Sequence, residues 1–418
     1  MAIPLQNLTG SCYFKFILSA TKARWYTVSI EEHNLSGGGI MEHQPVLFTP
    51  FKIGGLTLVN RITMTPAYLG YANSDGTVSD LLLTHYGTMA RSGAALIVVE
   101  NTGINSSALG SPFMLRADDD RYMEGLTELA KVIHAEGALA FIQLNHAGRY
   151  AFMPERVAPS AVPIGNVVPK EMTMQDIDET ILSFTKAAVR VQRAGFDGVE
   201  LHGGTGYLLA QFVSPRTNKR TDSYGGDLEK RARFPLEVVD AVIAKVAKDF
   251  PVGYRFLASE CLPDGLILDE AIPFAEDLAK RGISYLSVMV GTHESFSLEP
   301  YFSMDKTEGF MAGYAEIVKR VLPETPVITA GRIQSPEVAE AILQTEKADL
   351  IGLARVLFAD PLWPKKAQGL IKDPIIHCNP SCSLCMKRIM ARKPAVCSQW
   401  DKSFREAFLK KIGESSDN

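Results

Sequence analysis

Cysteine is concentrated in one short stretch near the end of the sequence. Four of the six cysteines have the spacing C-x3-C-x2-C-x11-C, at Cys378, Cys382, Cys385 and Cys397. Four soft thiolates can ligate either a tetrahedral zinc ion or an iron–sulfur cluster, and spacing alone separates these two poorly. Structural zinc sites usually have two close cysteine pairs. Three close cysteines with one distant partner therefore favour a cubane cluster.

A second set of polar residues follows apolar runs that are typical of buried strands. These residues are Tyr68, Asn101, Gln143, His202, Arg255, His293, Arg332 and Arg355. In a parallel barrel the active site lies beyond the carboxyl ends of the strands, and the loops after the last two strands commonly bind phosphate. Arg332 and Arg355 follow the last two runs, so they are candidate phosphate ligands. From the pattern alone, surface ion pairing is about as good an interpretation.

The elements that must position these residues are eight apolar, β-branched runs. They lie at 61–67, 94–101, 138–144, 195–202, 252–258, 283–290, 326–332 and 348–355. Stretches between them have helical apolar spacing, at 183–195, 270–282 and 336–346. Apolar strands that alternate with amphipathic helices indicate a parallel sheet covered on both faces. Eight such units predict an α/β fold, a (β/α)8 TIM barrel, with an open doubly wound sheet as the alternative.

Composition is that of an ordinary globular protein. The 418 residues are 46% hydrophobic and 22% charged, with a formal net charge of −4. This balance gives no basic footprint for nucleic acid or for a membrane surface. No apolar stretch reaches the length of a spanning helix, and the sparse, clustered cysteine fits a reducing compartment, so we expect a cytoplasmic protein. Residues 1–40 match no strand unit and predict an N-terminal extension.

Several motifs resemble one family closely. "VNRITMTPA", "QLNHAGR", "VELHGGTGYLLAQFVSPRTNKRTDSYGGDLEKRARFPLEVV" and "ITAGRI" with "ADLIGLARVLFADP" are similar to the Old Yellow Enzyme (NADH:flavin oxidoreductase) family, over about 47–370. With the cysteine stretch and "VGTHES", the chain resembles the iron–sulfur branch that includes 2,4-dienoyl-CoA reductase and trimethylamine dehydrogenase. The resemblance implies an FMN-binding barrel over 41–370 and an iron–sulfur segment with the tail over 371–418.

The resemblance also implies which residues bind FMN. Contacts with the flavin ring are expected from Thr65, Pro66, Asn101 and Gln143, although Gln143 could simply cap its strand. Arg255 falls where the family places a cation near the N1/O2 edge of the flavin, which stabilises the anionic reduced form. Tyr68 stands where relatives carry a residue that tunes the flavin, and it cannot form a covalent thioether. The phosphate is expected to contact Gly331, Arg332, Ala354 and Arg355.

The catalytic residues implied by the resemblance come from two loops. In many relatives two donors after strand four bind the substrate oxygen and a tyrosine protonates the α-carbon. His202 and Tyr207 match that pattern, whereas Thr205 replaces the second donor. The dienoyl-CoA reductase branch instead pairs the tyrosine with a histidine after strand six, and His293 matches it. We expect Tyr207 and His293 to deliver the proton and His202, helped by Thr205, to bind the oxyanion.

Relatives in the iron–sulfur branch carry four cysteines in the same place, with the first two gaps divided differently. A [4Fe-4S] cluster is therefore expected rather than zinc, with Cys12 and Cys261 as bystanders. The chain ends shortly after Cys397, so we expect the C-terminal FAD and nicotinamide domains of these relatives to be absent. Electrons would then come from NAD(P)H directly, or from a separate flavoprotein or ferredoxin-like donor.

The expected function is FMN- and cluster-dependent reduction of an activated C=C bond, in an enoyl- or dienoyl-CoA ester or another conjugated carbonyl compound. Two alternatives remain open. One is an amine dehydrogenase or N-demethylase, in which the cluster carries electrons away from the flavin. The other is a zinc-stabilised subunit without catalytic activity. The substrate, the physiological donor and the oligomeric state are not specified by the sequence.

Overall fold

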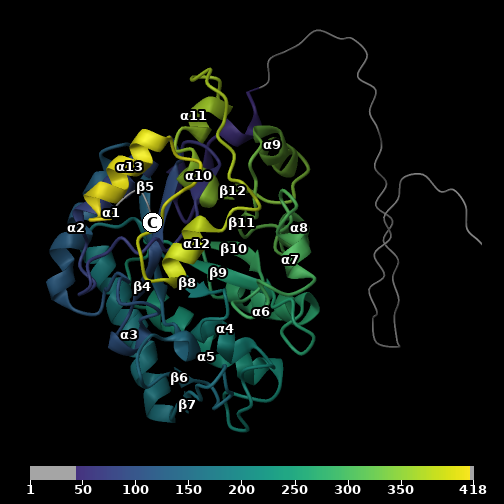
Figure 1. Ribbon diagram of the computed structural model, residues 1–418. Helices are drawn as coiled ribbons and strands as arrows, with labels where there is room; N and C mark the ends of the chain where they lie inside the picture. The colour runs from purple at the N-terminus through teal and green to yellow at the C-terminus, as the bar shows by residue number, and fades with distance from the viewer. Residues whose placement is uncertain (1–43, 415–418) are drawn as a thin grey trace, which may run out of the picture. The chain divides into compact units, whose positions relative to one another are not determined.

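The computed structural model describes residues 44–414, and its centre is a closed barrel of eight parallel strands (Figure 1). The expected extension at 1–40 and Cys12 lie outside the described residues. The barrel strands are β3 (Ile62–Met64), β4 (Leu96–Gly103), β5 (Leu139–Asn145), β8 (Gly198–Gly203), β9 (Val252–Ser259), β10 (Tyr285–Val290), β11 (Val327–Thr329) and β12 (Leu350–Leu353). Pairing of β12 with β3 closes the ring. The predicted TIM barrel is confirmed, and each predicted run overlaps one strand, with β4, β5, β8 and β9 ending one or two residues beyond their runs.

Helices surround the barrel and connect successive strands. They are α1 (Asp80–Arg91), α2 (Met123–His134), α3 (Met174–Arg193), α4 (Leu208–Val213), α5 (Leu228–Ile243), α6 (Leu268–Lys280), α7 (Tyr301–Met304), α8 (Ala312–Val321), α9 (Pro336–Gln344), α10 (Arg355–Ala359), α11 (Trp363–Ala367), α12 (Leu384–Met390) and α13 (Lys402–Lys411). No helix within 44–414 is long and apolar enough to cross a bilayer.

The helices form where amphipathic sequence meets a good cap. Thr173 and Asp176 make a reciprocal capping box at the start of α3, so this helix begins well before the stretch at 183–195 that apolar spacing predicts. Ser79 accepts a hydrogen bond from the N–H of Leu82 at the start of α1. The predicted helices at 270–282 and 336–346 correspond to α6 and α9 and agree within two residues at either end.

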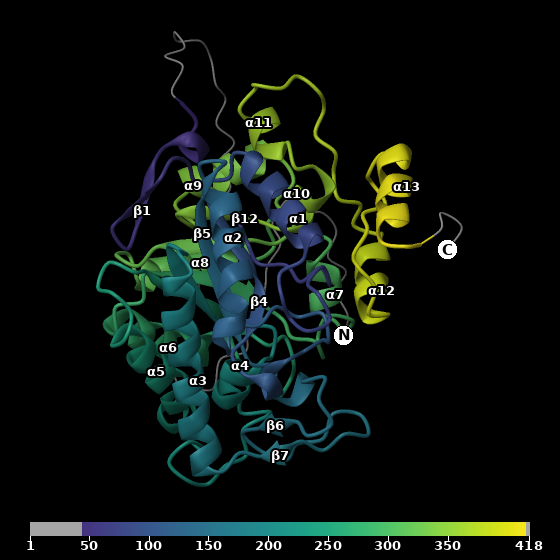
Figure 2. The same ribbon diagram turned by 90° about the vertical axis from the view of Figure 1, so that its left-hand side faces the viewer.

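A hairpin of β1 (Phe51–Ile53) and β2 (Leu56–Leu58) plugs one end of the barrel, and Figure 2 shows it across the molecule from α7 and α12. Ile53 and Leu58 pack against inward-facing strand residues that include Phe141 and Tyr285. A Cβ at Gly253 would lie 2.1 Å from the ring of Tyr285, so glycine leaves the space that this ring occupies. The packed plug leaves the other end, where the strands terminate, for a site.

The cysteine segment covers part of the open end. Trp400 donates to the carbonyl of Phe358 at 2.7 Å, and Tyr71 donates to the carbonyl of Ala395 at 2.7 Å. Figure 2 shows α12 and α13, in yellow, on the side of the molecule opposite the β1–β2 hairpin. A short pair, β6 (Val157–Ala158) and β7 (Lys170–Glu171), lies in the loop after β5. The open end is therefore framed by the last 37 described residues, 378–414, and by the strand-end loops.

Candidate functional site

One cavity at the open end gathers seven of the ten expected FMN-binding residues. Its free space is about 650 Å³, counting the part open to solvent. The seven residues are Thr65, Pro66, Arg255, Gly331, Arg332, Ala354 and Arg355. The N–H of Thr65 donates to the carbonyl of Leu353 at 2.9 Å, which places the end of β3 beside the end of β12. Three arginines in one cavity fit an anionic ligand such as FMN.

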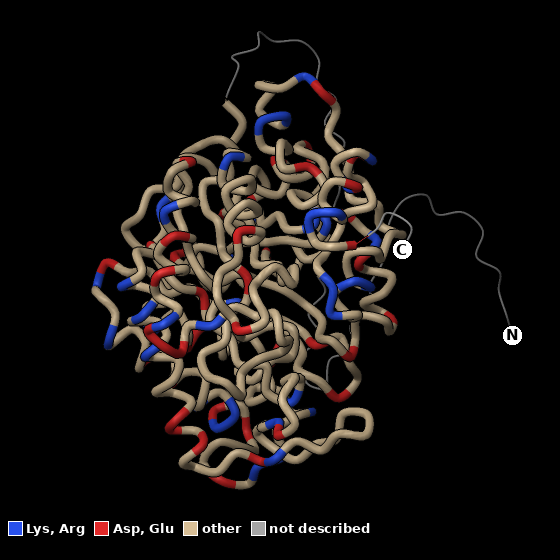
Figure 3. Tube along the Cα trace, turned by 60° about the vertical axis from the view of Figure 1, so that its left-hand side comes forward, with Lys and Arg blue, Asp and Glu red and all other residues tan. Residues whose placement is uncertain are grey.

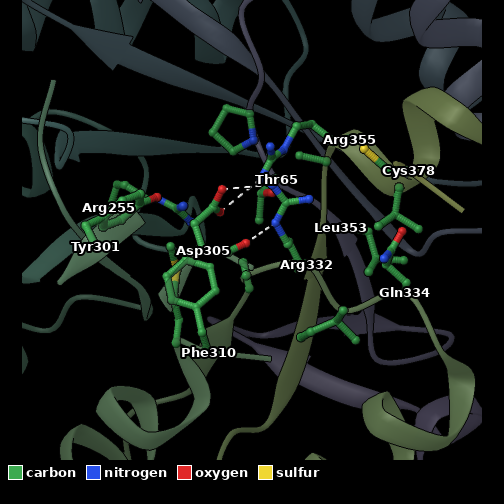
Figure 4. A pocket seen from close by; sticks show the side chains of 18 residues that line it. Thr65, Arg255, Tyr301, Asp305, Phe310, Arg332, Gln334, Leu353, Arg355 and Cys378 are labelled. Atoms are coloured by element: carbon green, nitrogen blue, oxygen red, sulfur yellow. Dashed lines mark hydrogen bonds and ion pairs between the residues drawn. The ribbon is translucent and has the colours of Figure 1, made fainter. Parts of the chain in front are cut away.

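The two expected phosphate ligands share one acidic partner, which Figure 4 shows between them. Nη2 of Arg332 lies 2.9 Å from Oδ2 of Asp305, and Nη2 of Arg355 lies 3.2 Å from Oδ1 of the same carboxylate. Nε of Arg332 also donates to the backbone carbonyl of Asp305. Sequence reasoning missed Asp305 because it lies in the long loop after β10, where no motif distinguishes it. Two guanidinium groups that converge on one carboxylate present suitable donors for a phosphate.

The other expected flavin contacts lie at the ends of neighbouring strands. Asn101 is buried where the pairing of β4 with β5 shifts register between Val99 and Thr102, an irregularity that can redirect a side chain. Gln143 is buried on β5, and its Nε2 donates to Oε1 of Glu200 at 2.7 Å. Tyr68 donates to Oγ of Ser111 at 2.5 Å and lines a smaller, apolar pocket beside the main cavity.

The expected catalytic side chains come together around Tyr207. The ring centroid of Tyr207 lies 5.0 Å from that of His202 and 5.2 Å from that of His293. Burial raises the pKa of Tyr207 to about 12, so its hydroxyl keeps its proton at neutral pH. Burial, and then the charges of Arg255 and His293, lower the pKa of His202 well below its usual range. The N–H of Gly204 donates to Nδ1 of His202 at 3.3 Å, which leaves the proton of the neutral ring on Nε2.

Thr205 contributes to this arrangement through its backbone. Its carbonyl accepts from the N–H of His293 at 3.3 Å, which ties the loop after β8 to the loop after β10. Its hydroxyl donates to Sδ of Met289 at 3.6 Å, and the expected help to the oxyanion stays a prediction. Thr205 has a φ of 58°, which is uncommon for a β-branched residue and concentrates strain at this turn.

Sequence reasoning missed a further aromatic residue, Tyr150, which directly follows the "QLNHAGR" motif. Its ring centroid lies 4.7 Å from that of His293 and 6.3 Å from that of Tyr207. Desolvation lowers the pKa of His293 to about 4, although the residue as a whole is exposed. Glu294, the next residue, pairs with Arg216 at 3.2 Å and so anchors the loop that carries His293.

The four clustered cysteines lie within mutual electrostatic range at the edge of the cavity. Cys378 lines the main cavity and Cys385 the smaller pocket. Burial, with smaller effects from the other three thiols, raises the pKa of Cys397 to about 11. The N–H groups of Leu384 and Gln399 donate to Sγ of Cys382 and Cys397 at 3.5 and 3.4 Å. Across residues 44–414 no three His, Cys, Asp or Glu side chains are gathered closely enough to hold a metal ion.

Comparison with known proteins shows the family of the chain. The model of the NADH:flavin oxidoreductase / NADH oxidase family matches residues 46–373. A protein named NADH oxidase from Thermoanaerobacter brockii is 42% identical over 82% of this chain and 54% of its own length. The match to the family model confirms the resemblance to the Old Yellow Enzyme family that the motifs indicate.

Two solved structures add to the comparison. A 2-naphthoyl-CoA reductase in complex with 2-naphthoyl-CoA superposes with a TM-score of 0.81 at 28% identity, over 85% of this chain and 57% of the other. The histamine dehydrogenase of Rhizobium sp. 4-9 gives a TM-score of 0.75 at 30% identity, over 85% and 52% of the two chains. The chain thus spans about half the length of these relatives.

Proposed function

The chain belongs to the NADH:flavin oxidoreductase / NADH oxidase family, and from this membership we propose that it reduces an activated C=C bond conjugated to a carbonyl group, including a thioester. Family membership makes it a flavin-dependent oxidoreductase, which disfavours a zinc-stabilised subunit without catalysis. The observation that carries the proposal is the position of Tyr207 between His202 and His293. A protonated phenol beside two largely neutral imidazoles suits proton delivery to a carbon whose neighbouring carbonyl gains negative charge.

FMN is the cofactor that the family implies, and the residues of the main cavity fit it. Arg332 and Arg355 would hold the phosphate, and Arg255, Asn101 and Gln143 would lie at the ring. When bound, FMN supplies the hydride to the β-carbon of the substrate. Nε2–H of His202 donates a hydrogen bond to the carbonyl oxygen, and the hydroxyl of Tyr207 delivers a proton to the α-carbon. The substrate therefore gains one hydride and one proton.

The spacing of the four cysteines supports a further part of the proposal, a [4Fe-4S] cluster held by Cys378, Cys382, Cys385 and Cys397. Their side chains would have to move closer together to bind it, because they are not gathered into a metal site among residues 44–414. Their thiols influence one another electrostatically, and backbone N–H groups donate to two of the sulfurs, as is common around thiolate ligands. The pKa values of Cys378, Cys385 and Cys397 are raised by burial. A bound cation would be needed to keep the thiols ionised at neutral pH, as thiolate ligation requires.

A small-molecule substrate and an NAD(P)H donor are typical of the family. With a cluster beside the cavity, the alternative donor is a separate flavoprotein or a ferredoxin-like protein. The two donors are separated by a simple measurement: NADH or NADPH is mixed anaerobically with the protein while the flavin absorbance is followed. Rapid bleaching supports direct reduction, and its absence supports a protein donor.

A second candidate function is oxidation of an amine. The likeness to histamine dehydrogenase at 30% identity favours it. The aromatic rings of Tyr150, Tyr207 and His293 would also suit an organic cation. The experiment that separates the two functions compares half-reactions. Reoxidation of the photoreduced protein by enones or enoyl thioesters supports the reductase, whereas bleaching of the oxidised protein by amines supports the dehydrogenase.

A further inference from the structure

Below the cavity, inside the barrel, lies a carboxylate that the proposed reaction does not use. Glu200 is fully buried on β8. Its Oε1 accepts from Nε2 of Gln143 at 2.7 Å, and its Oε2 accepts from the hydroxyl of Tyr285 at 3.0 Å. Both oxygens therefore accept hydrogen bonds, as an ionised carboxylate does. Burial raises the pKa of Glu200, and the charge of Arg255 with the hydrogen bonds from Gln143 and Tyr285 opposes that rise. A buried charge with two oriented donors is costly unless it has a counter-charge.

Arg255 supplies that counter-charge from β9. Glu200 pairs with Gly253 on β9, two residues before Arg255, and the charges of Arg255 and Glu200 interact over this distance; Nη1 of Arg255 donates to Oγ of Ser287 at 2.6 Å. Arg255 also lines the main cavity, whereas Glu200 does not. One cation thus faces the ligand while its balancing anion lies one layer deeper. The field that a ligand experiences at Arg255 depends on the charge of Glu200.

Glu200 also determines which hydrogen-bonding groups of Gln143 are free to contact a ligand. An amide has two donors and an acceptor, and its two ends are easily exchanged. Because one N–H of Gln143 Nε2 is engaged by Glu200, its Oε1 and its second N–H are the groups left for a ligand at the strand ends. An ionised carboxylate at position 200 only accepts hydrogen bonds, so it selects the orientation of the Gln143 amide in which Nε2 faces Glu200.

We infer that Glu200 is a positioning residue for the flavin, which orients the amide of Gln143 and balances the charge of Arg255. The inference rests on the proposed FMN site. Glu200 thereby sets the ratio of the affinities for reduced and oxidised FMN, and this ratio sets the reduction potential of the bound flavin.

The test is Glu200→Gln, which keeps the shape and removes the charge. The uncompensated Arg255 should favour anionic reduced FMN over oxidised FMN by about tenfold, a positive shift of about 30 mV for two electrons. Oxidised FMN should bind the apoprotein about fivefold more weakly, because a glutamine at 200 no longer selects one amide orientation. Potentials are measured by anaerobic spectroelectrochemical titration, and affinities by fluorescence quenching of free FMN.

Two further variants complete the experiment. Glu100→Gln changes another fully buried carboxyl, on β4, whose pKa is raised by burial to about 8; it is mostly protonated at pH 7, so the potential should not move. Tyr285→Phe removes one donor to Glu200 and should shift the potential in the same direction by less, which keeps the test valid if Glu200→Gln does not fold.

The outcomes separate the two proposals. An unchanged or more negative potential in both Glu200→Gln and Tyr285→Phe overturns the role of Glu200 while leaving the proposed function intact. A shift of similar size in Glu100→Gln also overturns it, because any buried substitution would then suffice. Wild-type protein that binds no FMN overturns both.

Discussion

The rings of Tyr207 and His293 meet with their centroids 5.2 Å apart and their planes at 66°, although they follow different strands of the barrel. The hydrogen bond from His293 N–H to the Thr205 carbonyl holds the two loops together. The structure thus brings together at one end of the barrel the two pairs expected to be catalytic, His202 with Tyr207 and Tyr207 with His293.

Replacing Tyr207 by Phe should separate proton delivery from flavin chemistry. The rate at which a conjugated acceptor reoxidises reduced flavin should fall by about 10²–10⁴-fold, the usual contribution of a positioned acid. Reduction of the flavin by dithionite should not change. Tyr314→Phe, a tyrosine on α8, is the matched control and should behave as wild type. Equal loss in both half-reactions would refute the assignment.

The pH dependence of the same step should be flat near neutrality. The pKa of Tyr207 is about 12 and that of His202 lies well below 6.5. The donor therefore stays protonated, and the His202 ring stays neutral, from about pH 6 to pH 9. Stopped-flow traces across this range should give one rate, with a decline only at more alkaline pH. A midpoint near pH 6.5 would instead show that an ordinary histidine controls the step.

Asp305 should compete with the FMN phosphate for Arg332 and Arg355. Asp305→Asn removes the charge that both guanidinium groups contact, so FMN should bind the apoprotein about tenfold more tightly. Asp240→Asn breaks an exposed ion pair with Arg281 and serves as the control. Titration of apoprotein with FMN measures both. Weaker binding in Asp305→Asn would mean that Asp305 supports the arginines in the bound state.

The proposed [4Fe-4S] cluster predicts that the protein contains iron. Protein purified without oxygen should contain iron and acid-labile sulfide, with a broad absorbance that dithionite bleaches. Cys397→Ser should lose most of this iron, whereas Cys261→Ser, which changes a cysteine outside the segment, should keep it. Zinc in place of iron would contradict the cluster and leave the FMN site unaffected.

Glu100 should make stability fall as pH rises. Burial raises its folded pKa to about 8 from a usual 4.5, so the folded state holds a proton that the unfolded state releases. That stabilisation is complete below pH 4.5 and is lost as pH rises towards 8, at up to about 1.4 kcal/mol per unit. Urea unfolding at pH 6.5, 7.2 and 8 should show a smaller decline in Glu100→Gln. Parallel declines would show that Glu100 ionises freely in the fold.

The barrel could be predicted from sequence because parallel strands are buried on both faces and therefore appear as continuous apolar runs. The places of Arg332 and Arg355 at the open end could be predicted for the same reason, because both residues closely follow strands. Asp305 and Tyr150 were not, because their positions depend on how long loops pack at the mouth. Glu200 had a signal, a charged residue within an apolar run, but its partners Gln143 and Tyr285 come from other strands.

The most direct test of the proposed function is the oxidative half-reaction. Anaerobic protein is photoreduced and mixed with a panel of enones and enoyl thioesters while flavin absorbance is followed. We predict that at least one conjugated acceptor restores the oxidised spectrum rapidly and in a manner dependent on Tyr207. No reoxidation by any acceptor, together with bleaching of the oxidised protein by an amine, would contradict the reductase and establish the dehydrogenase.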